Sequence, residues 1–194
     1  QVGRLLAALE ELGVLDDTLV VALSDNGASA EGGASGTSNE HRFSHRLPES
    51  VAEMLAHYDD WGGHGAYPHY AWGWAWAGNA PFALWKRYAW LGGTRVPFIV
   101  RWPEGIRARG EVRPQLGHAV DLLPTVLDAC GVEVPAAPLD GASLAPTFDD
   151  PAAPDPRSTQ YFEMLGSRSL IHDGWKITTD HVSRGVMDEE ELLV

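Results

Sequence analysis

The sequence contains one cysteine in 194 residues, Cys130, so it can form no disulfide bond within the chain and no cysteine-cluster metal site. Basic residues are also scarce: 14 Lys and Arg stand against 27 Asp and Glu, which gives a formal net charge of −13. Nucleic-acid binders rely on Lys and Arg to contact phosphates, so this balance argues against that class. No apolar run approaches the roughly 18–20 residues that a membrane span requires.

The composition is that of a globular protein, with 44% hydrophobic and 21% charged residues. The chain starts at Gln1 and stops at Leu193-Val194, directly after the acidic run 188–191. No basic–apolar–small stretch of a signal peptide is visible at the start. We therefore expect the chain to be a segment of a longer protein, and its compartment stays open.

The first 23 residues predict a helix, a tight turn and a strand. Apolar residues recur at helical spacing over 2–12, and Gly13 can close that helix. The almost wholly apolar run 18–23 favours a strand buried on both faces, as in a parallel sheet covered by helices. This order is half of a βαβ unit and indicates an α/β protein.

The middle of the chain is irregular and aromatic. Residues 24–39 are rich in Gly, Ser and Ala and indicate a loop, and 49–57 predicts a short helix. Seven of the eight tryptophans lie between Trp61 and Trp102. Three of them alternate over 72–76 and would share one face of an extended segment, which is typical of buried packing.

Regular structure returns in the second half. A buried strand is predicted over 96–102, and a helix over 122–130 that Asp121 can cap. Cys130 ends this apolar helix, where a buried structural thiol is the simplest interpretation. Antiparallel strands are predicted over 160–164 and 168–179, the latter folded at the two-residue turn Asp173-Gly174.

The sharpest chemical feature is Ser24-Asp25-Asn26-Gly27, just past the predicted strand. Ligand sites of open α/β sheets lie at the carboxyl ends of strands. Asp25 and Asn26 offer oxygen ligands, which suit hard cations such as Ca²⁺ and Mg²⁺. Two oxygens do not complete a site, and Asp-Asn-Gly is equally typical of a plain turn.

A second feature is Lys86, six residues before Gly92-Gly93-Thr94-Arg95-Val96-Pro97. The ammonium group of a lysine is a compact point charge suited to an anionic oxygen. The two glycines allow a close approach of the backbone. A solvated cationic loop before a strand is the alternative interpretation.

Taken in order, these motifs resemble the sulfatase family of the alkaline-phosphatase-like superfamily, specifically arylsulfatases. Ser24–Gly27 is similar to that family's second metal-ligand segment, and Lys86 with Gly92–Pro97 to its sulfate-contacting lysine and Gly-Gly-x-Arg-x-Pro turn. His118–Thr125 and Asp140–Leu144 are similar to the framework that follows. The resemblance implies a partial three-layer α/β sandwich. It places the later portion of the catalytic domain at 1–158 and the start of a small antiparallel C-terminal subdomain at 159–194.

The resemblance also implies metal-dependent hydrolysis of small sulfate esters by the full-length protein. Asp25 and Asn26 would be metal ligands, with Ca²⁺ favoured over Mg²⁺, and Lys86 a catalytic contact to sulfate. The nucleophile would be a formylglycine made within a Cys/Ser-x-Pro-x-Arg motif. Cys130 is followed by Gly-Val-Glu-Val and no Ser-x-Pro-x-Arg occurs, so we expect the formylglycine upstream of this chain, which alone would be inactive.

His64 and His69, among aromatic neighbours, are candidates for contacting the substrate, with a histidine protonating the leaving oxygen. Aromatic packing of a long loop is the alternative. Two other functions stay open. A phosphodiesterase or phosphonate monoester hydrolase of the same superfamily would use similar metal residues. A non-catalytic carbohydrate-binding module would use the tryptophans as a stacking platform.

Overall fold

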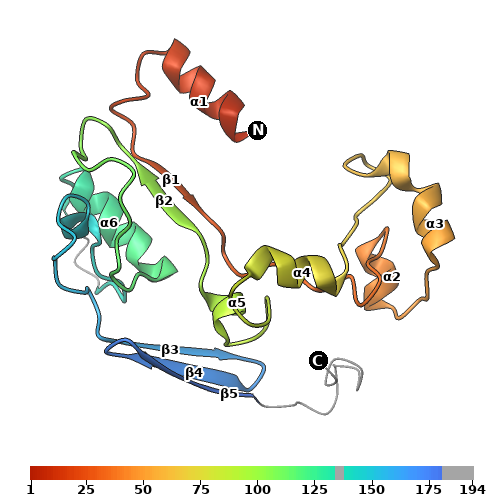
Figure 1. Ribbon diagram of the computed structural model, residues 1–194. Helices are drawn as coiled ribbons and strands as arrows, with labels where there is room; N and C mark the ends of the chain where they lie inside the picture. Colours follow the sequence, from red (N-terminus) through yellow and green to blue (C-terminus); the bar gives the residue numbers. More distant parts are fainter. Residues whose placement is uncertain (134–137, 181–194) are drawn as a thin grey trace. The chain divides into compact units, whose positions relative to one another are not determined.

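The computed structural model describes residues 1–133 and 138–180. Helices and strands are mixed along the chain, as expected for an α/β protein (Figure 1). In chain order they are α1 (Val2–Glu11), β1 (Val20–Leu23), α2 (Glu40–Ser44), α3 (Val51–Ala56), η1 (Tyr58–Asp60), α4 (Trp72–Asn79), α5 (Leu91–Thr94), β2 (Phe98–Arg101), η2 (Ala119–Asp121), α6 (Leu122–Ala129), η3 (Ala145–Thr147), β3 (Thr159–Met164), β4 (Ser167–His172) and β5 (Trp175–Thr179).

The described residues divide into two compact units. The first unit consists of 1–23, 97–133, 138–160 and 171–175, and the second of 24–96, 161–170 and 176–180. Across both, no described helix combines the length and the apolar character that crossing a membrane requires. The acidic run near the end of the sequence, and with it the end of the expected C-terminal subdomain, lies outside the described residues.

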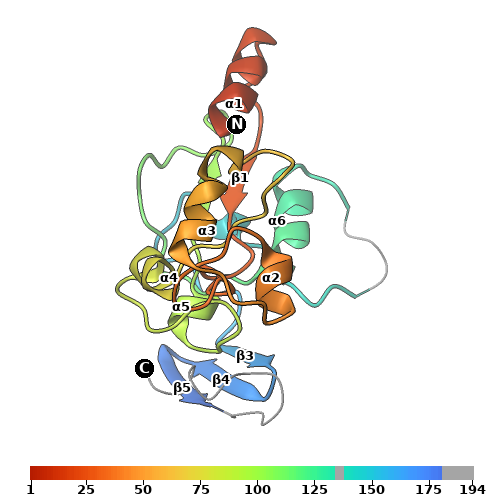
Figure 2. The same cartoon turned by 90° about the vertical axis from the view of Figure 1, so that its right-hand side faces the viewer.

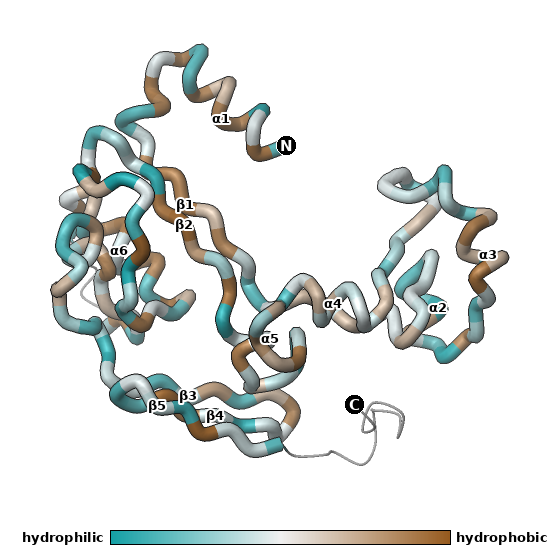
Figure 3. The backbone as a smooth tube through the Cα atoms, viewed as in Figure 1, coloured by the Kyte–Doolittle hydropathy of each residue, from teal (hydrophilic) through white to brown (hydrophobic). Residues whose placement is uncertain are grey.

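In the first unit β1 and β2 form an antiparallel ribbon, with Leu23 opposite Phe98. The run 18–23 thus contains a strand as predicted, but the expected parallel pairing and burial on both faces are wrong for the described residues. Leu23, Phe98 and Ile99 are exposed, and Figure 3 shows hydrophobic residues along both strands. An apolar run favours a strand that is buried by other parts of the protein, but it does not specify the partner strand or its direction.

Helices α1 and α6 lie where the sequence predicts them. Gly13 follows α1 at φ +70° and Gly131 follows α6 at φ +64°, in the left-handed region that glycine adopts without strain. Cys130 is exposed, so the prediction of a buried thiol is wrong. It comes five residues after the buried Thr125 and therefore lies about 140° around the helix from it.

Asp121 is completely buried and joins separate segments of the first unit. Its carboxylate accepts hydrogen bonds from the backbone N–H groups of His118 at 2.8 Å and Ala142 at 2.9 Å, and it pairs with the Arg157 guanidinium. The expected cap on α6 is not made, because the Asp121 side chain forms no cap hydrogen bond to that helix. Its oxygens are instead taken by partners 3, 21 and 36 residues away in the sequence.

Replacing Asp121 by alanine should destabilise the protein by about 3–5 kcal/mol, because it leaves the partly buried Arg157 cation and two backbone donors without their acceptor. Denaturant unfolding measures this loss. Asp128→Ala is the matched control: it removes one exposed hydrogen bond, from Ser143 at 2.6 Å, and should cost at most about 1 kcal/mol. Equal losses in the two variants would contradict the assigned role of Asp121.

In the second unit the tryptophans pack around α4. The chain is helical from Trp72, so the expectation of an extended segment with three tryptophans on one face is wrong. Trp72 and Trp76, four residues apart on a helix, share a face. Both contact the buried Trp85, with ring centroids 6.1 and 5.7 Å apart, whereas Trp74 is exposed. Trp85 and Ala75 belong to the hydrophobic core of this unit.

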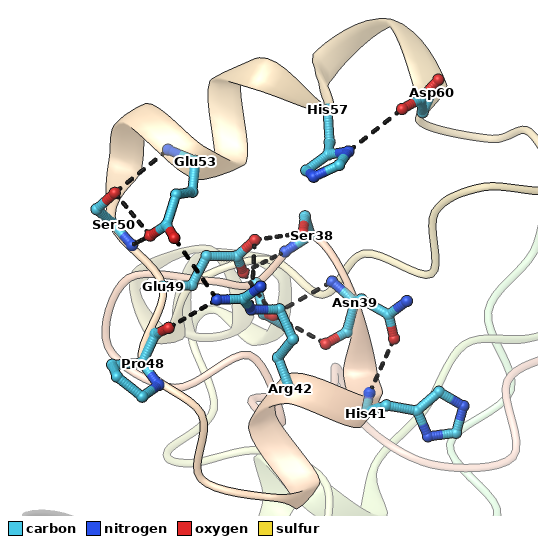
Figure 4. A network of polar contacts seen from close by, with 11 residues as sticks. Ser38, Asn39, His41, Arg42, Pro48, Glu49, Ser50, Glu53, His57 and Asp60 are labelled. Atoms are coloured by element: carbon cyan, nitrogen blue, oxygen red, sulfur yellow. Dashed lines mark hydrogen bonds and ion pairs between the residues drawn. The ribbon is translucent and has the colours of Figure 1, made fainter.

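A polar network holds the loop that precedes α3 (Figure 4). The helix is confirmed, and Ser50 and Glu53 form a capping box at its start. The Glu49 carboxylate accepts hydrogen bonds from the hydroxyl and, at 2.9 Å, from the N–H of Ser38. Burial acts to raise the pKa of Glu49, but these hydrogen bonds and the Arg42 charge outweigh it, and the pKa is lowered.

The antiparallel strands predicted near the end of the chain are confirmed. β3, β4 and β5 form a three-stranded sheet in that order and lie side by side in Figures 1 and 2. Asp173 at φ +46° and Gly174 at φ +82° form the turn between β4 and β5. Two consecutive positive φ angles are typical of the type I′ hairpin turn that the Asp-Gly pair predicts.

Candidate active site

The candidate metal residues lie in a turn directly after β1. The Ser24 hydroxyl donates to the Asn26 carbonyl at 2.7 Å, and the Asn26 side-chain amide donates to the Gly27 carbonyl at 2.9 Å. The second bond orients the amide group, so that its oxygen remains available as an acceptor. Asp25 is exposed and its carboxylate has no partner among the described residues. Both side chains therefore present an oxygen that is free to bind a ligand.

Gly27 brings this turn against the Gly-Gly segment. Its N–H donates to the Gly93 carbonyl at 3.1 Å, and a β-carbon at position 27 would stand 1.7 Å from the Gly92 carbonyl oxygen. Gly92 and Gly93 are equally crowded: β-carbons there would meet the carbonyl oxygens of Leu84 at 2.0 Å and Tyr88 at 2.1 Å. The two glycines lie in the one-turn helix α5, so space, and not an unusual backbone angle, requires them.

Lys86 contacts the loop that follows the Asp25-Asn26 turn. Its backbone N–H donates to the Ala28 carbonyl at 2.9 Å, and its ammonium group donates to a carboxylate oxygen of Glu31 at 2.8 Å. The candidate sulfate contact and the candidate metal turn, 60 residues apart in the sequence, are thus joined through residues 27–31 of one loop. The sequence holds only two lysines, Lys86 and Lys176, so this one is a rare ammonium group in the chain.

Glu31 lies in the candidate site and was not predicted from the sequence. Its carboxylate also accepts from the Ser29 hydroxyl at 2.8 Å. Burial acts to raise the pKa of Glu31, but the hydrogen bonds from Lys86 and Ser29 outweigh burial, and the pKa is lowered. One feature of the sequence could have pointed to Glu31: it is the only charged residue between positions 27 and 39.

The structure places His69, but not His64, beside this loop. His69 pairs through its backbone with Thr37, by hydrogen bonds of 2.9 and 3.0 Å, and its carbonyl oxygen would stand 2.8 Å from a β-carbon at position 32 of the loop. Its Nε2 atom is buried 3.7 Å from a Glu40 carboxylate oxygen and has no hydrogen-bond partner among the described residues. His64 is exposed and makes no polar contact with the described residues.

The metal-binding capacity of the described residues is partial. They contain no group of three or more His, Cys, Asp or Glu side chains that could hold a metal ion. Asp25 and Asn26 offer one carboxylate and one amide oxygen, which is the donor chemistry that Ca²⁺ and Mg²⁺ prefer. These two residues therefore fit a hard divalent cation, and further ligands have to come from elsewhere.

Strand β5, which follows the Gly-Gly segment in the sequence, contacts helix α5. Lys176 donates to the Thr94 hydroxyl at 3.0 Å and lies 5.4 Å from the centre of the Phe162 ring. Burial lowers the pKa of Lys176 from 10.5 to about 8. The Trp90 indole N–H donates to the Asp180 carboxylate, at 2.8 and 3.0 Å from its two oxygens. These contacts hold both ends of the short helix that carries Gly92 and Gly93.

Comparison with known proteins identifies the family. The family model described as Sulfatase matches residues 1–132, more than half of the sequence, and the chain therefore belongs to the sulfatase family. The matched range contains Asp25, Asn26, His64, His69 and Lys86. It ends close to the end of α6, before β3, β4 and β5.

Individual relatives agree with this assignment. The chain is 32% identical to the steryl-sulfatase of Mus musculus over 146 residues, covering 75% of the chain and 18% of that protein. It is 29% identical to the arylsulfatase of Klebsiella aerogenes over 153 residues, covering 75% of the chain and 31% of that protein. The chain thus spans between about a fifth and a third of the length of these relatives.

A solved structure supports the fold. It comes from work on the metabolism of multiple glycosaminoglycans by Bacteroides thetaiotaomicron, and it matches with a TM-score of 0.57 over 91% of this chain and 30% of its own. At 17% sequence identity this likeness concerns the fold alone. The chain accordingly has the α/β, alkaline-phosphatase-like fold of the sulfatases, as the sequence motifs implied.

Gly27→Ala should destabilise the second unit by about 1–3 kcal/mol, because the added β-carbon forces the turn away from Gly92. Gly73→Ala is the matched control. Position 73 lies within α4 with nothing within 4 Å of an added β-carbon, and alanine should stabilise that helix by up to about 1 kcal/mol. Urea unfolding compares the two, and a Gly27→Ala variant as stable as Gly73→Ala would show that the two turns are not in contact.

The low pKa of Lys176, about 8, predicts a stability that rises with pH. Between about pH 8 and 10.5 the unfolded state binds a proton that the folded state has released, so increasing pH favours the folded state in this window. Lys176→Met removes this titration. The denaturation midpoint of the variant minus that of the original protein should therefore be larger at pH 7 than at pH 9.5. A difference independent of pH would contradict the burial of this amine.

Proposed function

We propose that the protein containing this chain hydrolyses sulfate esters of small organic molecules, aryl sulfates among them, with the help of a divalent cation. The observation that carries the proposal is the junction of the Asp25-Asn26 turn, the Gly92-Gly93 segment and Lys86 through residues 27–31. Oxygen ligands for a cation and a single ammonium group are what binding and activating a sulfate group requires. Family membership supports the same reaction.

In this proposal Asp25 and Asn26 hold the cation, with Ca²⁺ favoured over Mg²⁺. When bound, the cation would supply a concentrated positive charge to the sulfate group. We place the formylglycine nucleophile outside residues 1–194, because no Cys/Ser-x-Pro-x-Arg motif occurs within them. We assign 1–158 to the later part of the catalytic domain and 159–194 to a small C-terminal subdomain.

Lys86 would act on the sulfate group directly. As the sulfur–oxygen bond to the leaving group breaks, negative charge grows on the oxygens, and a fixed ammonium group nearby lowers the energy of that state more than that of the bound ester. The overall reaction consumes one water and releases an alcohol or phenol together with sulfate. His69 would lie beside the leaving group and protonate its oxygen, and His64 is a further candidate contact for the organic part of the substrate.

The packing of the tryptophans favours an enzyme over a carbohydrate-binding module. Trp72, Trp76 and Trp85 contact one another around α4. Rings that are used in packing have less free surface for stacking on a sugar. Of the three tryptophans that alternate in the sequence, Trp74 is the most exposed, at 71%.

Replacing Asp25 or Lys86 by alanine in the complete protein should lower the hydrolysis of an aryl sulfate by at least about a hundredfold. Asp25 would hold the cation and Lys86 would contact the sulfate group, so each variant loses a positive charge that stabilises the transition state. Turnover of 4-nitrophenyl sulfate measures this, with and without a chelator. Asp59→Ala, which removes an exposed acid without a partner among the described residues, is the control and should retain activity.

Activity retained in both site variants would overturn the site assignment. Preferential turnover of an aryl phosphonate or a phosphodiester, lost in the same variants, would assign the site to a related hydrolase. Sugar binding that is unaffected by chelator and by Asp25→Ala would instead indicate a binding module.

A further inference from the structure

We propose that Glu31 is a positioning residue that holds the Lys86 ammonium group in the direction of the sulfate group. This inference rests on the proposed function, since it assigns Glu31 a role only through Lys86. The Lys86 ammonium lies 2.8 Å from one carboxylate oxygen of Glu31, and the Ser29 hydroxyl donates to that same oxygen at 2.8 Å. Lysine and glutamate are thus joined by a short ion pair that a third group helps to orient.

The backbone on both sides of Glu31 is held in place. The Ala30 carbonyl accepts a hydrogen bond from the Trp72 indole at 2.9 Å, and the Gly33 carbonyl accepts one from the Trp72 N–H at 3.0 Å. Gly32 lies so close to the neighbouring segment that a β-carbon there would stand 2.5 Å from the Tyr70 carbonyl oxygen. The backbone position of Glu31 is therefore fixed by α4 and by the segment that carries His69, so Glu31 does not lie on a freely moving loop.

The other partner, Lys86, is held equally firmly. Its N–H donates to Ala28 at 2.9 Å, and the preceding Trp85 is buried against Trp72, Trp76 and Tyr88. Exposed ion pairs usually contribute little, because two mobile side chains must be ordered to form them. Here both backbones are already ordered, and the side chains are only partly exposed, at 24% for Glu31 and 36% for Lys86. Much of that ordering cost has been met by folding.

The geometry leaves Lys86 able to bind an anion while it is paired. An ammonium group has three N–H donors, and one of them is directed at Glu31. Two donors remain for sulfate oxygens. Glu31 therefore removes rotational freedom from a long side chain without using all of its hydrogen bonds, which lowers the entropy that sulfate binding would otherwise cost.

In the complete protein, Glu31→Gln should lower kcat for an aryl sulfate by between about tenfold and a hundredfold, because the ammonium group loses its fixed direction. Glu31→Asp, which retains the charge on a shorter side chain, should fall between that variant and the original protein, and circular dichroism reports whether each variant folds. Asp59→Asn, with the same change in charge at an exposed site, should leave kcat unchanged.

A double-mutant cycle separates this role from a general effect. If Glu31 acts through Lys86, the double variant Glu31→Gln/Lys86→Ala should be no less active than Lys86→Ala alone. If the activity losses of the two single variants multiply in the double variant, the positioning role is overturned and the proposed function still stands. Full activity of Lys86→Ala would overturn both the role of Lys86 in the proposed function and the positioning role that depends on it.

Chemical labelling supplies a readout that does not depend on activity. The chain contains only two lysines, so acetylation by limiting acetic anhydride, read by mass spectrometry, reports Lys86 against Lys176 as an internal reference. Glu31→Gln removes the carboxylate partner of Lys86 and should raise the rate of acetylation of Lys86 relative to that of Lys176. Asp59→Asn should leave this ratio unchanged. An unchanged ratio in Glu31→Gln would show that the ion pair does not hold Lys86, and would overturn the proposal.

Discussion

A β-carbon on Gly27 would stand 1.7 Å from the Gly92 carbonyl oxygen, and the arrangement of the candidate site depends on the absence of that atom. Without side chains at 27, 92 and 93, two turns meet backbone to backbone through the bond from the Gly27 N–H to the Gly93 carbonyl. The segment after β1 is thereby placed against the segment that follows Lys86. A contact between backbones is rigid, because neither partner has rotamers to sample, and rigidity is what a site of a few charged groups requires.

The charge of the molecule matters less to this site than the local distribution of charge. A formal net charge of −13 opposes the approach of an anionic ester. Lys86 contacts the loop 27–31 that follows the Asp25-Asn26 turn, and a cation held by Asp25 and Asn26 would add to its field. Glu31 places one more negative charge beside Lys86. This charge weakens the attraction of Lys86 for sulfate, but the ion pair fixes the direction of the ammonium group.

Features with a local cause could be predicted from the sequence. Asp173-Gly174 requires positive φ angles that these two residues tolerate, and the hairpin follows. Gly13 and Gly131 end their helices for the same reason. Predictions failed where the cause is not local: three alternating tryptophans over 72–76 could suit a strand or a helix, and the packing of Trp72 and Trp76 on the distant Trp85 selects the helix.

The sequence by itself determined the family, the Asp25-Asn26 turn after a strand, and Lys86 before two glycines, because these are short patterns whose chemistry can be read from neighbouring residues. Only the tertiary structure decided that β1 pairs antiparallel with β2, that Asp121 binds Arg157 instead of capping α6, and that Glu31 meets Lys86. Glu31 and Lys86 are 55 residues apart. Their contact depends on how the chain packs between them, which no local preference of either residue specifies.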